Sequence, residues 1–178
     1  QRIGTVMKWT IAKGWRLDNP AESIAKALPK HDNTKKSRKA LPYPEVPGCI
    51  ATVQASGAGI VTKLALEFLV LTAARSGEVR QAPWSEIDFD KATWTIPAER
   101  MKMKRGHRVP LSPRALQILE EAKGLSDGGD LVFPGTRVKR PLSDATMLKL
   151  LKENGYAVDV HGFRTSFRTW AQERTNFP

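Results

Sequence analysis

The longest apolar stretch of this sequence runs from Ile60 to Ala74 and is interrupted by two charged residues, Lys63 and Glu67. A helix that crosses a membrane needs roughly 20 apolar residues, so this stretch is too short to span one. It is typical of a helix buried in the core of a globular domain. The chain has 178 residues, 40% of them hydrophobic, which is enough for one domain with a real core and part of a second.

The charge of the chain predicts a polyanionic partner. Lys and Arg number 29 against 18 Asp and Glu, which gives a formal net charge of +11. A balance this basic favours nucleic acid, and duplex DNA is the expected partner. An anionic membrane surface is the second candidate, but no apolar run is long enough to span a membrane and we expect no membrane partner. The single cysteine, Cys49, excludes an intrachain disulfide and a cysteine-based zinc cluster, which fits a reducing, cytoplasmic setting.

A basic stretch divides the chain. Apolar residues at helical spacing predict a helix over residues 2–14 that ends at Gly14, and a short helix follows near residues 21–28. We interpret residues 29–40 as a linker, with the domain boundary near its end. Lys36 and Arg38 are expected to contact backbone phosphates of DNA, and the alternative is a solvated tether.

Residues 41–178 are predicted to be mostly α with a small antiparallel β-sheet of about three strands. Helical patterns cover residues 44–56, 60–74 and 76–81, and later helices begin at Ser112-Pro113, at Ser143-Asp144 and near Gly162. Between them the pattern changes to alternation over residues 87–96, which predicts a two-stranded ribbon. Residues 108–111 are the candidate third strand.

The first segment that indicates chemistry, TAARSGEVR, follows the predicted buried helix. Because the chain turns at Gly77, Arg75 would leave the edge of the core on a fixed backbone, which suits a guanidinium that holds a phosphate. Glu78, three residues further on, could orient it. The alternative is an ordinary surface Arg–Glu pair at i, i+3 spacing.

Two further segments carry basic residues at turns. Residues 102–108, KMKRGHR, indicate a hairpin tip that reaches into a DNA groove, and the alternative is a generic basic patch that binds phosphate. His161 and Arg164 lie three residues apart at a predicted helix start, where backbone N–H groups favour an anion. An imidazole beside a permanent cation suits phosphoryl transfer, and the alternative is a lone capping histidine.

Together, and in this order, these segments resemble the tyrosine recombinase and phage integrase family, and most of all its prophage branch. The resemblance covers residues 41–178 and rests on TAARSGEVRQAPWSEID, KMKRGHRVPLS, LVFPG and HGFRTSFRTWAQE. It implies a recombinase catalytic domain over these residues. It also implies that residues 1–28 are the C-terminal end of the preceding core-binding helical domain.

The resemblance assigns roles by position. Arg75 matches the first catalytic arginine, Lys102 the hairpin lysine with Lys104 as its rival, His161 and Arg164 the His-x-x-Arg pair, and Glu78 a supporting acid. Lys104, Arg105 and Arg108 are expected to bind DNA. The family's second His or Trp and its tyrosine nucleophile would follow Pro178, and Tyr43 and Tyr156 do not fit the nucleophile's place. We therefore expect a catalytic domain truncated before its last helices and inactive as it stands.

The implied function is site-specific DNA recombination, as in prophage integration and excision. A tyrosine attacks a phosphodiester, forms a 3′-phosphotyrosyl link and releases a 5′-hydroxyl. Arg75 and Arg164 hold the phosphate, Lys102 protonates the leaving oxygen and His161 assists proton transfer. The resemblance implies no cofactor and no metal, and a homotetramer of the full-length protein on duplex attachment sites in a bacterial cytoplasm.

Three other functions remain as alternatives. A DNA-binding module without chemistry would use the same charge, but it has no need for two arginines that converge on one point. A topoisomerase of type IB shares the chemistry without strand exchange, and the segment before the catalytic domain favours an integrase. A metal-dependent nuclease would require a carboxylate cluster with metal-ligand spacing, which the sequence does not show.

Overall fold

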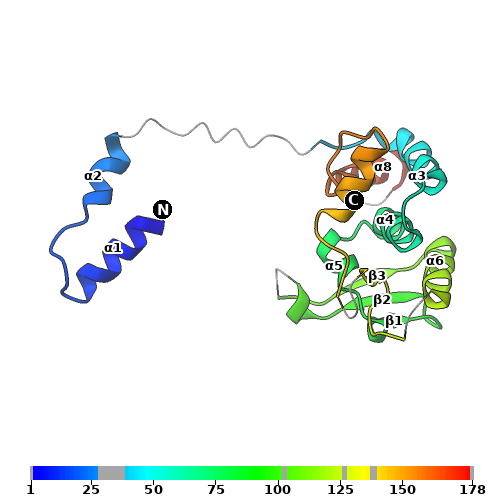
Figure 1. Cartoon of the computed structure of the whole chain (residues 1–178), viewed down its shortest axis with the longest axis horizontal. Helices are drawn as coiled ribbons and strands as arrows, with labels where there is room; N and C mark the ends of the chain where they lie inside the picture. Colours follow the sequence, from blue (N-terminus) through cyan, green and yellow to red (C-terminus); the bar gives the residue numbers. More distant parts are fainter. Residues whose placement is uncertain (1, 28–38, 102–103, 126–127, 137–139, 177–178) are drawn as a thin grey trace. The chain divides into compact units, whose positions relative to one another are not determined.

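The structure is a computed structural model that describes residues 2–27, 39–101, 104–125, 128–136 and 140–176. The chain divides into two compact units, residues 1–37 and 38–178, and the division falls inside the stretch interpreted as a linker (Figure 1). The first unit contains α1 (Arg2–Ala12) and α2 (Pro20–Ala27). As predicted, α1 ends before Gly14, which adopts the left-handed conformation with φ of +73°.

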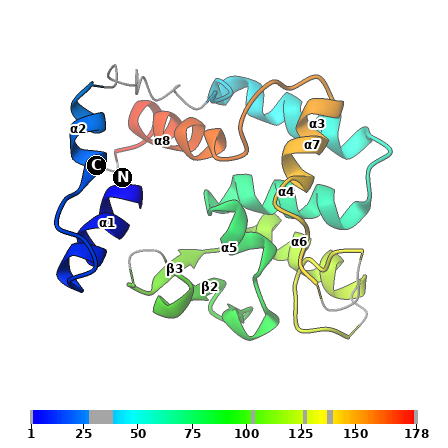
Figure 2. The ribbon, with the colours of Figure 1, turned by 60° about the vertical axis from the view of Figure 1, so that its left-hand side comes forward.

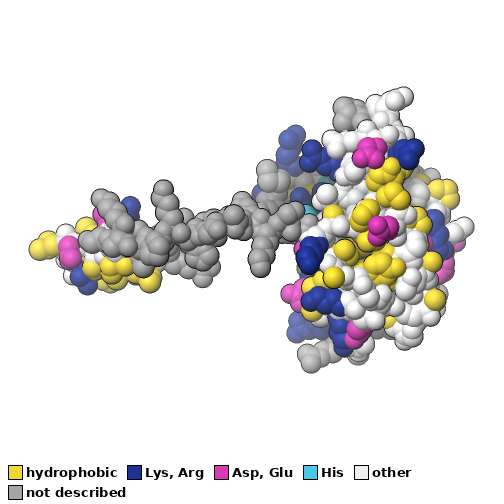
Figure 3. Space-filling model, turned by 90° about the horizontal axis from the view of Figure 1, so that it is seen from above, with side chains coloured by type: hydrophobic (Ala, Val, Ile, Leu, Met, Phe, Trp, Pro, Cys, Tyr) yellow, Lys and Arg dark blue, Asp and Glu magenta, His cyan; other side chains and the backbone are white. Residues whose placement is uncertain are grey.

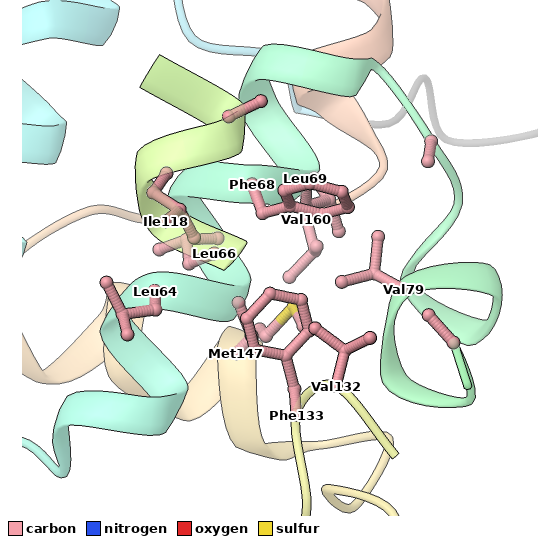
Figure 4. Packing of buried hydrophobic residues seen from close by; sticks show 14 of the residues in the cluster. Leu64, Leu66, Phe68, Leu69, Val79, Ile118, Val132, Phe133, Met147 and Val160 are labelled. Carbon is pink, nitrogen blue, oxygen red and sulfur yellow. The ribbon is translucent and has the colours of Figure 1, made fainter. Parts of the chain in front are cut away.

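The second unit is built around α4 (Ile60–Thr72), as the apolar stretch predicts. The side chains of Leu64, Leu66, Phe68 and Leu69 are at most 1% exposed and pack against residues of neighbouring elements (Figure 4). Figure 2 shows α4 surrounded by the other helices, which are α3 (Val46–Ala55), α5 (Ser76–Arg80), α6 (Pro113–Gly124), α7 (Thr146–Glu153) and α8 (Gly162–Arg174).

Two charged residues, Lys63 and Glu67, lie in this helix, and Glu67 is the buried one. Glu67 is 8% exposed. Its carboxylate accepts hydrogen bonds from Arg114 Nε at 2.7 Å, from Arg114 Nη2 at 3.0 Å and from Gln54 Nε2 at 2.6 Å. This bidentate pair connects α4 to α6 on the surface of the core. No helix in the described part of the chain is both long and apolar enough to cross a membrane.

The sheet has three antiparallel strands in the order β1-β2-β3: β1 (Ile87–Asp88), β2 (Thr93–Ile96) and β3 (His107–Pro110). Trp94 is paired with Ile87 on one side and with Val109 on the other. Trp94 is fully buried, and its ring lies 5.4 Å from that of Phe68, so the sheet packs on α4. The prediction of a mostly helical domain with a small three-stranded sheet is confirmed.

The predicted helix starts are partly right. Ser112 caps α6, because its hydroxyl accepts a hydrogen bond from the Ala115 N–H at 3.3 Å. The cap predicted at Ser143 is wrong: α7 begins at Thr146, after Ala145. Residues 143–146 form a separate turn in which the Thr146 N–H bonds the Ser143 carbonyl, and the Ser143 hydroxyl pairs with that of Thr146 at 2.9 Å.

Gly162 allows the start of α8 to lie against the chain that enters this unit. A Cβ at this position would lie 2.4 Å from the carbonyl oxygen of Lys39 and 2.8 Å from Cα of Ala40. These are backbone atoms, which cannot rotate away as the end of a flexible side chain can. The hydroxyl of Ser166, one turn later, donates to the carbonyl of Leu41.

Gly162→Ala is therefore expected to destabilise the fold by about 1–3 kcal/mol, because the helix or the entering chain must move. Denaturant unfolding measures the loss. The matched control is Gly48→Ala in α3, where a Cβ meets nothing within 4 Å and alanine favours the helix. Equal unfolding midpoints for the two variants would contradict the packing described here.

Candidate active site

Arg75 lies where the chain turns from α4 into α5. Helix α4 ends at Thr72, and Ala73 adopts the left-handed conformation with φ of +48°. Arg75 is then the N-cap residue of α5. The Glu78 carboxylate accepts from the Arg75 backbone N–H at 2.9 Å and pairs with Arg75 Nη1 at 2.5 Å. Glu78 therefore fixes both the backbone and the side chain of Arg75.

This pair is asymmetric in its exposure. The side chain of Glu78 is 8% exposed, whereas that of Arg75 is 39% exposed. The carboxylate is turned inward and the guanidinium keeps donors that reach solvent. An arginine held in this way can bind an anion from solution without first ordering its own side chain.

His161 and Arg164 lie at the start of α8, with His161 in the N-cap position. Arg164 is half-buried, and its Nη1 donates to the backbone carbonyl of Ala73. This bond joins the start of α8 to the turn that carries Arg75, although the two segments are about 90 residues apart in sequence. His161 is exposed at the same end of the helix.

Arg75 is close enough to affect the pKa of Arg164. Burial lowers the pKa of the Arg164 guanidinium, the positive charge of Arg75 lowers it further, and the Glu78 carboxylate partly opposes both effects. An arginine remains protonated at neutral pH even so. Two neighbouring cations that share the Glu78 carboxylate favour an anion, because a bound anion relieves their repulsion.

An open cleft of about 820 Å³ contains Arg75 and His161. Its other lining residues are Ser76, Gly77, Glu78, Gln81, Glu99 and Arg100. Arg164 lines a second groove, of about 550 Å³, which also contains Ala73 and therefore adjoins the turn before Arg75. The structure thus brings Arg75 and His161 into one cleft and places Arg164 beside them, across the Ala73 carbonyl.

The second groove is basic. It is lined by His107 and Arg108 of β3 and by Arg164 and Arg168 of α8, and none of its described lining residues is acidic. Figure 3 shows Lys and Arg side chains gathered on one side of the 38–178 unit, next to a histidine. Arg168 was not among the residues predicted from sequence. Its position four residues after Arg164, on the same face of α8, is the signal that could have found it.

Of the remaining predicted residues, the structure describes two and leaves three outside the described residues. Lys104 and Arg105 are exposed in the turn before β3, where Lys104 has φ of +53°. Lys102, Lys36 and Arg38 lie outside the described residues. Their predicted roles therefore rest on the sequence alone.

The two tyrosines of the chain lie away from the cleft. The Tyr43 hydroxyl accepts a hydrogen bond from Arg174 Nε at 3.0 Å, and the Tyr156 hydroxyl pairs with that of Thr52 at 3.2 Å. Neither residue lines the cleft that contains Arg75 and His161. Among the residues that the structure describes, no group of three His, Cys, Asp or Glu side chains could hold a metal ion.

Comparison with known proteins identifies one family. A model of the phage integrase family matches residues 39–175. The prophage integrase IntA of Escherichia coli K12 is 36% identical over 182 residues, which cover 100% of this chain and 43% of that protein. The integrase of enterobacteria phage P4 is 35% identical over 187 residues, which cover 94% of this chain and 42% of that protein. The chain thus spans less than half the length of these relatives.

Solved structures agree in fold. A lambda integrase dimer bound to a COC′ core site has a TM-score of 0.68 at 21% identity, covering 98% of this chain and 65% of that one. The XerA recombinase has a TM-score of 0.61 at 15% identity, covering 98% of this chain and 61% of that one. At this identity the likeness concerns the fold.

Proposed function

This chain belongs to the phage integrase family, and we propose that it supplies most of the catalytic centre of a longer tyrosine recombinase, which cuts and rejoins duplex DNA. The observation that carries the proposal is the contact between the start of α8 and the turn at Arg75. It brings together two arginines, a histidine and one supporting carboxylate from distant parts of the sequence. A protein that only binds DNA has no need of this convergence.

The arrangement suits phosphodiester cleavage. As the nucleophile attacks, negative charge develops on the non-bridging oxygens of the phosphate, and Arg75 and Arg164 neutralise it. A tyrosine oxygen forms the new bond to phosphorus while the bond to the 5′ oxygen breaks. That oxygen takes a proton from Lys102, and His161 assists proton transfer. Religation is the reverse reaction, and the covalent intermediate conserves the bond energy.

The nucleophile in this proposal is a tyrosine outside residues 1–178, because Tyr43 and Tyr156 do not line the cleft. Residues 1–28 are the end of a core-binding helical domain and residues 29–40 the basic linker. The partner is duplex DNA at attachment sites, and the site of action is the bacterial cytoplasm. One solved relative is a lambda integrase tetramer bound to a Holliday junction, and we expect a homotetramer on DNA here too.

The basic groove gives the DNA backbone a path beside the cleft. We expect the affinity for duplex DNA to fall by about tenfold or more between low and physiological salt, because each neutralised phosphate releases counterions on binding. Arg168→Ala should make the plot of log affinity against log salt concentration less steep, by about one unit of slope. Lys149→Ala on α7, where Lys149 pairs with Glu153 at 3.5 Å, is the matched control and should leave the slope unchanged. Salt-independent binding of the unaltered protein would contradict this path.

The proposed function is tested with the full-length protein and a duplex that contains its target site. A nick beside the cleavage position lets the short released strand diffuse away, so the intermediate accumulates. We expect a protein–DNA adduct that survives denaturation and forms in EDTA. Cleavage that requires added divalent metal and leaves no adduct would replace this proposal with a metal-dependent nuclease. Binding without any adduct would leave a DNA-binding module.

A further inference from the structure

Arg100 is an internally bonded arginine at the wall of the cleft. It ends the short 3-10 helix Ala98–Arg100, which directly follows β2. Its Nη2 donates to the backbone carbonyl of Glu78 at 2.7 Å, and its Nη1 pairs with the carboxylate of Glu86. The Arg100 side chain is 21% exposed and that of Glu86 is 8% exposed. Both of its terminal amino groups are therefore engaged within the protein.

The partner of Arg100 is itself fixed to the sheet. Trp94 Nε1 donates to the same Glu86 oxygen at 2.9 Å, and Trp94 is fully buried on β2. At the other end, Glu78 holds the backbone and side chain of Arg75. Hydrogen bonds thus run from the sheet, through Glu86 and Arg100, to the backbone carbonyl of Glu78, and the carboxylate of the same Glu78 holds the candidate catalytic arginine.

Helix α5 needs such a support. It is only five residues long, and a helix this short has little stability of its own in water. Val79, which is fully buried, and Arg80, whose Nη1 donates to the Leu142 carbonyl at 2.6 Å, attach α5 to its surroundings, but both lie after Glu78. The bond from Arg100 to the Glu78 carbonyl adds a directional restraint at the residue that orients Arg75.

We propose that Arg100 is a positioning residue of the recombinase centre: it ties α5 to the sheet through Glu86 and so sets where the Arg75 guanidinium meets the phosphate. This inference rests on the proposed function. Arg100 acts through Glu78 and Arg75 and does not touch the reacting phosphate. Misplacing a phosphate-binding group by about 1 Å can cost up to roughly a hundredfold in rate. Because Arg100 itself does not contact the DNA, its loss should slow the cleavage step and leave DNA affinity unchanged.

The test uses the full-length protein and single-turnover cleavage of the nicked duplex at saturating protein. Arg100→Met keeps the length and packing of the side chain but removes its donors. It should slow cleavage by about tenfold or more with little change in the dissociation constant for DNA. Arg100→Lys, which can reach one of the two acceptors, should recover part of the loss. Glu86→Gln, which keeps an acceptor for Trp94, should give a smaller loss in the same direction.

A double-mutant cycle separates positioning from general stability. Glu78→Gln alone should also slow cleavage by about tenfold, and Arg100→Met added to it should have little further effect, because both changes loosen the same restraint. The matched control is Arg114→Met, which removes an arginine from another poorly exposed carboxylate, that of Glu67, away from the cleft. Thermal melting identifies a temperature at which all variants are folded. At that temperature this control should cleave at the unaltered rate.

Three results would overturn the inference: an Arg100→Met variant that cleaves at the unaltered rate, losses of Arg100→Met and Glu78→Gln that multiply, or an equal loss in Arg114→Met. If Arg100→Met does not fold, the cycle of Glu86→Gln with Glu78→Gln decides by the same criterion. Each of these outcomes requires an unaltered protein that forms the covalent adduct. Failure of that adduct contradicts the proposed function instead.

Discussion

Arg75→Ala and Arg164→Ala in the full-length protein are each expected to slow DNA cleavage by about a hundredfold or more, which corresponds to roughly 3 kcal/mol. Each arginine contributes mainly where charge develops on the phosphate, so the loss should fall on the cleavage rate and leave DNA affinity largely intact. Arg164 has the further task of bonding the Ala73 carbonyl. Arg164→Lys should therefore not restore the rate, because an ammonium is a point charge that cannot bond the carbonyl and a phosphate in one plane.

The control for these variants lies on the same helix. Arg174 is an exposed arginine of α8 whose Nε bonds the Tyr43 hydroxyl away from the cleft. Arg174→Ala should cleave at nearly the unaltered rate. Single-turnover rates and binding titrations on the same nicked duplex measure both quantities. If Arg75→Ala or Arg164→Ala loses affinity and rate in the same proportion, these residues bind DNA without a special role at the transition state.

The second large effect concerns Lys102, which is compared with Lys104. Lys102→Ala is expected to slow cleavage by about a hundredfold or more, because the 5′ oxygen then leaves without a proton donor. A substrate whose 5′ leaving atom is sulfur should largely restore the rate, since a thiolate is a good leaving group without protonation. Lys104→Ala should instead cause a modest loss of binding that sulfur does not restore.

The comparison of the two lysines tests which of them is the general acid. Lys104 lies in an exposed turn with φ of +53°, and Lys102 is assigned through the resemblance. Rates on the oxygen and sulfur substrates, measured for each variant, give the answer directly. If the sulfur substrate restores Lys104→Ala and not Lys102→Ala, the general acid lies two residues further along the chain.

Elements with a strong local pattern could be predicted from the sequence. The buried helix α4, the strand pair around Trp94 and the Ser112 cap each depend on residues close in sequence. Ser143 shows the limit: a capping residue also suits a separate turn, and the apolar face of α7 begins only later, at Met147.

The same distinction holds for the site. The Arg75–Glu78 contact is local and follows from i, i+3 spacing. The bond from Arg164 to the Ala73 carbonyl depends on how α8 packs against the end of α4, and no spacing in the sequence indicates it. The contacts of Arg100 could not be predicted from the sequence either. Glu86 lies 14 residues away, at no helical or strand spacing from Arg100, and the Glu78 carbonyl is one of many backbone acceptors.

The central claim is that the residues of this chain prepare a DNA phosphate for attack by a tyrosine. The chemical bond between protein and DNA in the adduct tests this claim most directly. The adduct of the full-length protein and the nicked duplex is digested with protease and nuclease, and the nucleotide-bearing peptide is sequenced by mass spectrometry. We expect one peptide, joined to the 3′ phosphate through a tyrosine other than Tyr43 and Tyr156. Linkage through a serine, through either of those two tyrosines or to a 5′ phosphate would contradict the account.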